Sequence, residues 1–275
     1  MITLNDATLC YKKNKPILDH INLDIAPGCI YGLLGKNGEG KTTLLNILSG
    51  QLFLNSGSCL VFDENPAERN VSLLQKLFLL PEEISLPDVT AEAYIKMYAP
   101  FYPTFREDIC KSCFDQLEID TTARLSKMSQ GQRKKVAITL ALSAHTPLLL
   151  MDEPTNGLDI PSKTIFRKLV ASFTEESQTI IISTHQVRDL ESLIDSVLIL
   201  DNKGFLMNCN LNEISSKLSF RLVKPDEKIL YSETTPIGTM GVSENLNGEE
   251  TSVSLELLFN AVIRHPSEIK RLFNR

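Results

Sequence analysis

The chain has 275 residues, of which 43% are hydrophobic and 23% are charged, as in an ordinary globular protein of about two domains. Its 34 acidic residues outnumber its 28 basic ones, and the net charge of -6 leaves no basic footprint for DNA or RNA. No apolar run approaches the roughly 18 residues that a membrane span needs. Nucleic acid as the main partner and a membrane span within the chain are therefore not expected.

The first residues, MITLND, lack the basic and then apolar pattern of an export signal. Six cysteines are too few for a disulfide framework in a chain of this length, so reduced thiols are expected. Cys110 and Cys113 form one CxxC pair with no second pair and no histidine nearby, in a segment of helical character. We interpret them as ordinary helical thiols and not as a metal or redox site.

The N-terminal part of the chain favours strands. Ile21, Leu23 and Ile25 alternate with polar residues, which predicts a half-buried strand. A compact apolar run at 29–34 predicts a second strand, and it leads into a glycine-rich loop. Residues 42–48 have helix formers and apolar spacing up to Gly50. The predicted order is strand, loop, helix.

The middle of the chain changes from helices to an alternation of strands and helices. Residues 89–144 are mostly helical in character, with breaks at Pro100 and Pro103. The strands predicted after them are Leu148–Asp152, 179–183 and Ser196–Asp201, and the helices between these strands are 160–175 and 186–194. Such alternation predicts a largely parallel sheet that is covered on both faces.

The last part of the chain, from about Lys217, has a different character. Runs at 219–223 and 228–232 favour short strands, and an apolar helix is expected at 255–263. We predict a small α+β appendage.

The glycine-rich loop at residues 35–42, GKNGEGKT, fits G-x-x-x-x-G-K-[ST] at every fixed position. Glycines let successive backbone N–H groups turn toward phosphate oxygens, Lys41 can reach the β- and γ-phosphates, and the Thr42 hydroxyl can bind magnesium. The helix that follows directs the positive end of its dipole at the same anion. A strand before the loop and a helix after it are the context that this motif requires, so a chance glycine turn is a poor alternative.

The strand predicted at Leu148–Asp152 ends in two carboxylates, Asp152 and Glu153. Asp152 is suited to hold magnesium through water, and Glu153 can polarise a water for in-line attack on the γ-phosphate. On its own such a pair is often a helix N-cap. Together with the phosphate loop it predicts a nucleoside triphosphatase.

Between these motifs lies the pentapeptide MSQGQ at residues 128–132, followed by Arg133, Lys134 and Lys135. Here the chain resembles the ATP-binding cassette (ABC) family, whose signature has the form LSGGQ. Ser129 and the Gly131 amide at a helix N-terminus form an anion site. The resemblance implies that this site meets the nucleotide of a second subunit, since each chain's own loop already holds one.

Further family marks follow in order, and the resemblance covers residues 1–215. It implies that Tyr11 stacks on adenine, that residues 156–159 form a loop at the dimer interface, and that His185 contacts the γ-phosphate. The implied catalytic residues are Glu153 and His185, and the implied magnesium ligands are Thr42, Glu82 and Asp152. The implied nucleotide-binding residues are Tyr11, Gly35, Asn37, Gly38, Gly40, Lys41, Thr42, Thr43, Ser129, Gly131 and Gln132. Glu82 stands where the family normally has glutamine, and Met128 and Gln130 replace leucine and glycine of the signature.

The resemblance implies the P-loop NTPase fold: a mainly parallel sheet with N-terminal antiparallel β elements, an inserted helical subdomain and the small appendage. The expected domains are an ABC ATPase at 1–216, with the insert at about 85–145, and the appendage at 217–275. The expected cofactors are ATP and Mg²⁺.

The implied function is an ATP-hydrolysing subunit that dimerises, with itself or a related ATPase, around ATP. It would power a separate transmembrane permease from the cytoplasmic face of the membrane. Residues 98–103 resemble members that serve exporters. The alternatives are an ABC ATPase that moves no solute and a nucleotide-switched regulatory module.

Overall fold

The computed structural model describes residues 1–12, 15–201, 204–223, 229–236 and 238–273. Its centre is a six-stranded sheet in the order β5-β6-β7-β3-β8-β9. The strands are β3 (Ile30–Leu34), β5 (Leu77–Leu80), β6 (Leu148–Asp152), β7 (Thr179–Thr184), β8 (Ser196–Asp201) and β9 (Gly204–Asn210). All neighbours are parallel except β8 and β9. The predicted α/β fold with a mainly parallel sheet is confirmed.

The strands of this sheet send alternate side chains into two hydrophobic cores, as the two-residue period of a strand requires. Leu149 and Met151 of β6 pack in one core, and Leu148 and Leu150 pack in the other. Both faces of the sheet are therefore buried, which explains why β6 is a continuous apolar run instead of an alternating one.

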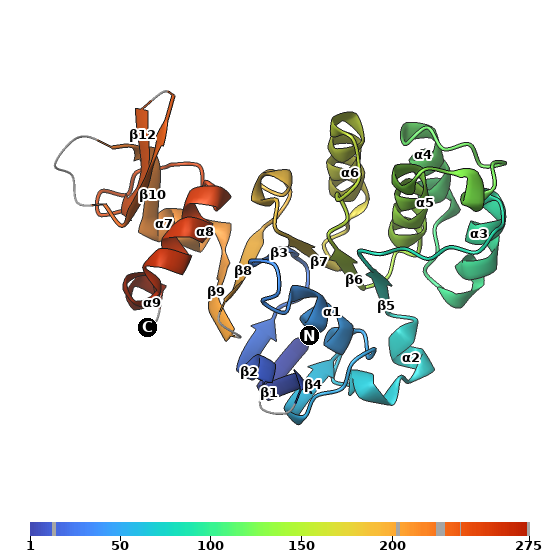
Figure 1. Cartoon of the computed structure of the whole chain (residues 1–275), viewed down its shortest axis with the longest axis horizontal. Helices are drawn as coiled ribbons and strands as arrows, with labels where there is room; N and C mark the ends of the chain where they lie inside the picture. The colour runs from blue at the N-terminus through green and yellow to red at the C-terminus, as the bar shows by residue number, and fades with distance from the viewer. Residues whose placement is uncertain (13–14, 202–203, 224–228, 237, 274–275) are drawn as a thin grey trace.

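One face of the sheet is covered by helix α1 (Lys41–Leu48) and by an antiparallel sheet of three strands, β2-β1-β4 (Figure 1). These strands are β1 (Ile2–Lys12), β2 (Lys15–Ile25) and β4 (Ser56–Val61). A short 3₁₀ turn, η1 (Pro66–Glu68), and helix α2 (Val71–Leu74) lead from β4 to β5. The predicted antiparallel N-terminal strands are thus present.

The other face carries α6 (Ile160–Phe173) and the helices between β5 and β6 (Figure 1). These are α3 (Ala91–Tyr98), α4 (Glu107–Gln116) and α5 (Gln130–Ser143), with 3₁₀ turns η2 (Ala99–Phe101) and η3 (Leu125–Lys127). Cys110 and Cys113 are buried in α4, and burial raises the pKa of Cys113 to about 12. Both thiols face the core in a helix, as we interpreted them.

The appendage packs beside β9 at one end of the molecule (Figure 1). It consists of α7 (Leu211–Lys217), a sheet of β10 (Leu218–Leu222), β12 (Gly238–Glu244) and β11 (Tyr231–Thr235) in that order, and helices α8 (Leu255–Arg264) and α9 (Pro266–Phe273). The strand expected at 228–232 begins at Tyr231 in the structure, and Lys228 lies outside the described residues.

The helix predicted at 186–194 is wrong. This segment contains only the 3₁₀ turn η4 (Val187–Asp189), followed by turns. Its hydrogen bonds, such as Leu190 N–H to Val187 O and Leu193 N–H to Leu190 O, mostly span three residues. Leu190, Leu193 and Ile194 have helical spacing and are buried, but their burial comes from packing against the core and does not require an α-helix.

Among the helices in the described parts of the chain, none combines the length and the apolarity that crossing a bilayer takes.

Candidate active site

The phosphate loop joins the end of β3 at Leu34 to the start of α1 at Lys41. Gly40 caps α1 with φ at +101°, a conformation that residues with a side chain rarely adopt. A Cβ on Gly40 would also lie 2.9 Å from the Leu18 side chain. Glycine at this position is therefore required by both the turn and the packing.

The Lys41 ammonium lies over this loop and is 7% exposed. Its Nζ donates hydrogen bonds to Gly35 O at 2.7 Å and Lys36 O at 3.2 Å. Burial lowers the pKa of Lys41, and the nearby carboxylates of Glu153 and Asp152 partly offset this effect. A phosphate at the loop adds negative charge where this buried cation gains most from it.

The Thr42 hydroxyl and the Asp152 carboxylate meet at the end of β6. Thr42 Oγ1 donates to Asp152 Oδ2 at 2.6 Å, and Ser183 Oγ donates to Asp152 Oδ1. Hydroxyl and carboxylate oxygens are the hard ligands that Mg²⁺ prefers, with nucleotide phosphates and water completing its shell. Thr42 and Asp152 therefore fit a magnesium ion whose other ligands are nucleotide phosphates and water.

Glu153 adopts a left-handed backbone conformation with φ at +44°, directly after β6. Its N–H donates to Ser183 O at 3.2 Å and to Ser183 Oγ at 3.1 Å, which holds this turn against β7. Such strain in a non-glycine residue is typical of functional sites. The turn directs a nearly buried carboxylate toward the phosphate loop.

Three side chains surround the Glu153 carboxylate. His185 Nδ1 lies 2.8 Å from Oε1, Thr184 Oγ1 donates to Oε2 at 3.3 Å, and Lys41 Nζ lies 4.0 Å from Oε1. The structure thus brings together Lys41, Thr42, Asp152, Glu153 and His185, which the sequence placed in three separate motifs. A carboxylate and an imidazole in contact beside a phosphate loop can activate and orient a water molecule.

Ser129 and Gln132 form a capping box at the start of α5. Ser129 Oγ accepts from Gln132 N–H at 3.2 Å, and Gln132 Oε1 accepts from Ser129 N–H at 2.8 Å. Both residues are exposed. In the described chain no hydrogen bond or ion pair joins residues 129–132 to the phosphate loop, so the signature is not part of the site around Lys41.

Tyr11, on β1, lies beside the start of α1, directly after the phosphate loop. Its hydroxyl is 3.1 Å from Thr43 Oγ1, and the residue is 62% exposed. The exposed ring is free to accept a stacked base, although its stacking on adenine remains a prediction.

Glu82 contacts the segment after Glu153 and none of the predicted metal ligands. Its Oε1 accepts from Asn156 Nδ2 at 3.0 Å, and its carbonyl accepts from the buried Lys134 Nζ at 2.9 Å. These residues line a cavity of about 430 Å³ with Gln130, Arg133 and Gly157, among others. The role of Glu82 as a metal ligand stays a prediction.

Sequence reasoning missed Ser183, which bonds both Asp152 and Glu153, and Thr184, which bonds Glu153. Their position immediately before His185 at the end of a predicted strand was the available signal. It also missed Phe259 of the appendage, which lines a cavity beside the phosphate loop. Nothing in the sequence connects Phe259 with that loop.

Comparison with known proteins identifies the family. The family model for the ABC transporter matches residues 18–156. An uncharacterised ABC transporter ATP-binding protein of Methanocaldococcus jannaschii is 30% identical over 262 residues, covering 90% of this chain and 94% of the relative. The chain belongs to the ABC transporter family.

Another relative and one solved structure extend this comparison. The bacitracin transport ATP-binding protein BcrA of Bacillus licheniformis is 29% identical, over 85% of this chain and 78% of the relative. The dimeric ATP-binding cassette MJ0796, in a post-hydrolysis state with ADP and phosphate, has a TM-score of 0.68 at 22% identity, covering 77% of this chain and 99% of that one. The fold is that of the ABC ATPase cassette. The chain is an ATP-binding subunit of the ABC family, whose reaction is ATP hydrolysis.

Proposed function

We propose that this subunit hydrolyses ATP at the site around Glu153 to power export through a separate transmembrane permease. Residues 1–216 are the ABC ATPase domain, the helices within about 85–145 are its inserted subdomain, and residues 217–275 are the appendage. One observation carries this proposal: Glu153 Oε1 lies 2.8 Å from His185 Nδ1 and 4.0 Å from Lys41 Nζ. It supports the proposal because a carboxylate suited to act as base, an imidazole that can orient it and a cation suited to bind phosphate lie in one cluster.

In the proposed mechanism, the backbone of the phosphate loop and the Lys41 ammonium hold the β- and γ-phosphates. The γ-phosphate takes the place of the Gly35 and Lys36 carbonyls as partner of Lys41. Thr42, Asp152 and Glu82 would hold Mg²⁺, which when bound would neutralise developing phosphate charge. Glu153 accepts the proton of the attacking water. His185 holds that carboxylate in position relative to the γ-phosphate.

We propose that ATP is held between two subunits. Ser129 and Gln132 are exposed at the start of α5, and in the described chain no hydrogen bond or ion pair joins them or Gly131 to their own phosphate loop. A γ-phosphate that bridges one subunit's phosphate loop and the other's α5 favours the closed dimer only until it is cleaved. The partner is a second copy or a related ABC ATPase.

The assignment to an exporter is supported by the likeness of residues 98–103 to exporter-linked members and by the name of the bacitracin transport relative. In this proposal the subunit is peripheral, on the cytoplasmic face of the membrane, and α3–α5 contact the permease.

The experiment that tests the transport proposal is purification of the tagged chain from detergent extracts of its own cells. We expect a multi-span membrane protein to co-purify in fixed stoichiometry, and the subunit to leave the membrane fraction when that protein's gene is deleted. A subunit that stays in the soluble fraction of intact cells, with full ATPase activity and no membrane partner, would contradict the transport proposal and favour a soluble ABC ATPase.

A further inference from the structure

Helix α8 of the appendage is fastened to the segment that follows His185. Arg188, in η4, donates through Nε at 2.8 Å to Glu256 Oε2 and lies 2.7 Å from the same carboxylate through Nη2. Glu256 is in the first turn of α8. Figure 1 shows α8 between the appendage sheet and the cassette, so it is the helix placed to bridge them.

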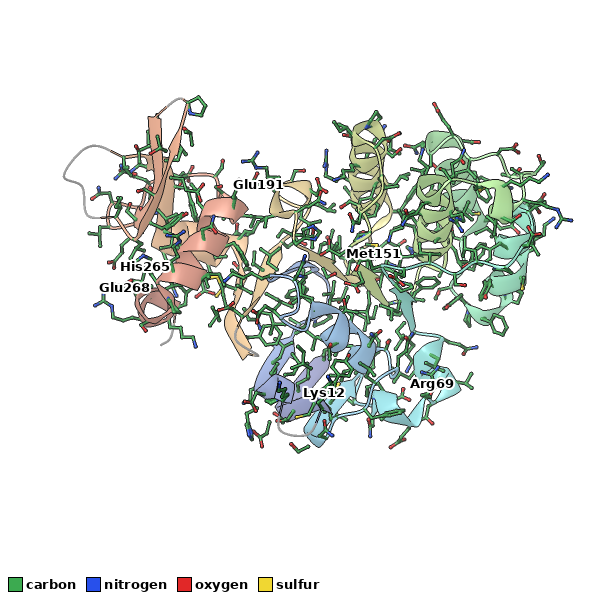
Figure 2. All side chains as sticks on the ribbon, viewed as in Figure 1. Lys12, Arg69, Met151, Glu191, His265 and Glu268 are labelled. Atoms are coloured by element: carbon green, nitrogen blue, oxygen red, sulfur yellow. The ribbon has the colours of Figure 1, made fainter. Side chains whose placement is uncertain are left out.

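A second contact comes from Glu191, two residues after η4. Its Oε1 accepts from Leu255 N–H at 3.0 Å, at the first residue of α8. Ser254, the N-cap residue of α8, makes no capping hydrogen bond with its side chain, so the cassette supplies an acceptor for this helix end. Figure 2 labels Glu191 in this position, beside the start of α8.

Phe259, one turn further along α8, reaches the active site. It lines a cavity of about 260 Å³ together with Lys36 and Asn37 of the phosphate loop and with Thr184 and His185. The appendage therefore forms part of the wall next to the proposed γ-phosphate site.

The opposite side of η4 is held by the cassette. Asp189 Oδ2 accepts from Thr155 Oγ1 at 2.8 Å and from Lys163 Nζ at 2.7 Å, and Lys163 Nζ also donates to Gln186 Oε1 at 2.7 Å. A three-residue 3₁₀ turn has little stability of its own. Its position, and with it the position of His185, is set by the contacts on both sides.

We infer that α8 is a positioning element for His185, and that Glu256 and Glu191 are its positioning residues. Through them the appendage controls the hydrolysis step without contacting the reacting atoms. This inference rests on the proposed role of His185. It gives the appendage a function in catalysis, since a movement of α8 changes where His185 lies relative to Glu153.

The test is a double-mutant cycle with Arg188→Ala and Glu256→Ala. Arg188 is 80% exposed and Glu256 is 42% exposed in their side chains, and exposed ion pairs have modest energies. We therefore expect kcat to fall about twofold to fivefold in each single variant, and no further in the double variant. ATP affinity should stay at the wild-type value. The matched control is Glu213→Gln, which removes a 2.7 Å ion pair with Lys217 within α7.

The NMR signals of the four histidine imidazole rings supply a readout that a merely structural role of α8 would not change. Glu256→Ala should shift the His185 signal. The signal of His20, which pairs with Asp6 in the N-terminal sheet, should not change. An unmoved His185 signal with wild-type kcat, or additive losses in the cycle, would overturn the inference. His185→Ala separates the two claims: if this variant keeps full turnover, the proposed function of His185 fails, and if it is inactive while the α8 variants are unaffected, only the positioning role fails.

Discussion

At the scale of single residues, the active site depends on a lysine that is buried before any phosphate arrives. The Lys41 ammonium replaces lost water with two carbonyl oxygens and two nearby carboxylates. Burial still lowers its pKa, which means that the charged form is less stable here than in water. Phosphate oxygens remove this cost, so the site favours an anion over an empty loop.

Lys41→Ala should weaken ATP binding roughly tenfold to a hundredfold, the range expected for lost hydrogen bonds to a charged group. Equilibrium titration with a fluorescent ATP analogue measures this change. Lys36→Ala is the matched control in the same loop, because that ammonium lies 3.8 Å from Asp201 and has no assigned role in binding. Unchanged ATP affinity of Lys41→Ala would refute the assignment of the phosphate loop.

Glu82 stands at the position where the resemblance to the family predicts a glutamine. Its carboxylate is held by Asn156 and also acts electrostatically on both Lys41 and Lys134. A glutamine at this position could keep the bond to Asn156 through its amide oxygen. It would remove one negative charge from the predicted magnesium site.

Glu82→Gln should therefore raise the Mg²⁺ concentration needed for half-maximal ATPase activity several-fold, roughly the effect of one surface-accessible charge. ATP binding in the absence of Mg²⁺ should not weaken. The neighbouring exposed Glu83→Gln serves as the control. An identical magnesium dependence in the Glu82 variant and the wild type would place Glu82 outside the metal site.

At the scale of elements, the start of α5 is stabilised by its own side chains while Ser129 and Gln132 remain exposed. The capping box of Ser129 and Gln132 satisfies the backbone within the helix end, and Gly131 packs so closely that a Cβ there would lie 3.0 Å from Gly157 O. The signature thus lies directly against the loop after Glu153. Any partner that binds α5 will also meet this loop.

Ser129→Arg should block the ATP-dependent dimer and leave ATP binding by the monomer unchanged, because the long side chain then fills the anion site at the start of α5 and keeps the partner's γ-phosphate out of it. Light scattering with and without ATP measures the dimer, and titration measures the binding. Ser216→Arg on α7 introduces the same side chain at an exposed position outside the signature. Loss of monomer binding in the Ser129 variant would show that the signature does not act on the partner's nucleotide.

The elements also show where sequence reasoning succeeds. Local motifs predicted β3, the phosphate loop and α1, because the strand, the glycines and the phosphate-binding lysine are contiguous in the sequence. They failed at 186–194, where Leu190 and Ile194 have helical spacing but are buried by long-range packing. A short run of apolar residues at helical spacing cannot distinguish an α-helix from an irregular segment that is buried against the core.

At the scale of the whole molecule, the site is assembled from segments far apart in the chain. Asp152 and Glu153 were predicted from their strand, but their bonds to Ser183 and Thr184 depend on the pairing of β6 with β7. The Arg188–Glu256 pair joins the cassette to the appendage across an exposed surface, where a charged residue carries no signal of its partner. The motifs therefore predict the site's core, and its supporting contacts require the fold.

The fold also places the two halves of the proposed ATP site at separate positions on one chain. The phosphate loop follows β3 and leads into α1, whereas the signature lies at the start of α5, against the loop that follows Glu153. A second subunit is the simplest way to bring a phosphate loop and a signature together. Hydrolysis and dimerisation should then change together when the base is removed.

The most direct test of the proposed ATP site is to measure the turnover and the oligomeric state of Glu153→Gln with ATP and Mg²⁺. Glutamine keeps the size and a hydrogen bond to Thr184 or His185 but cannot accept the water proton, so kcat should fall by about a hundredfold or more. Sedimentation velocity should then show a stable dimer containing two ATP molecules for every two chains, where the wild type returns to monomers as ATP is consumed. A Glu153→Gln protein that remains monomeric with ATP and turns over at the wild-type rate would contradict the central claim.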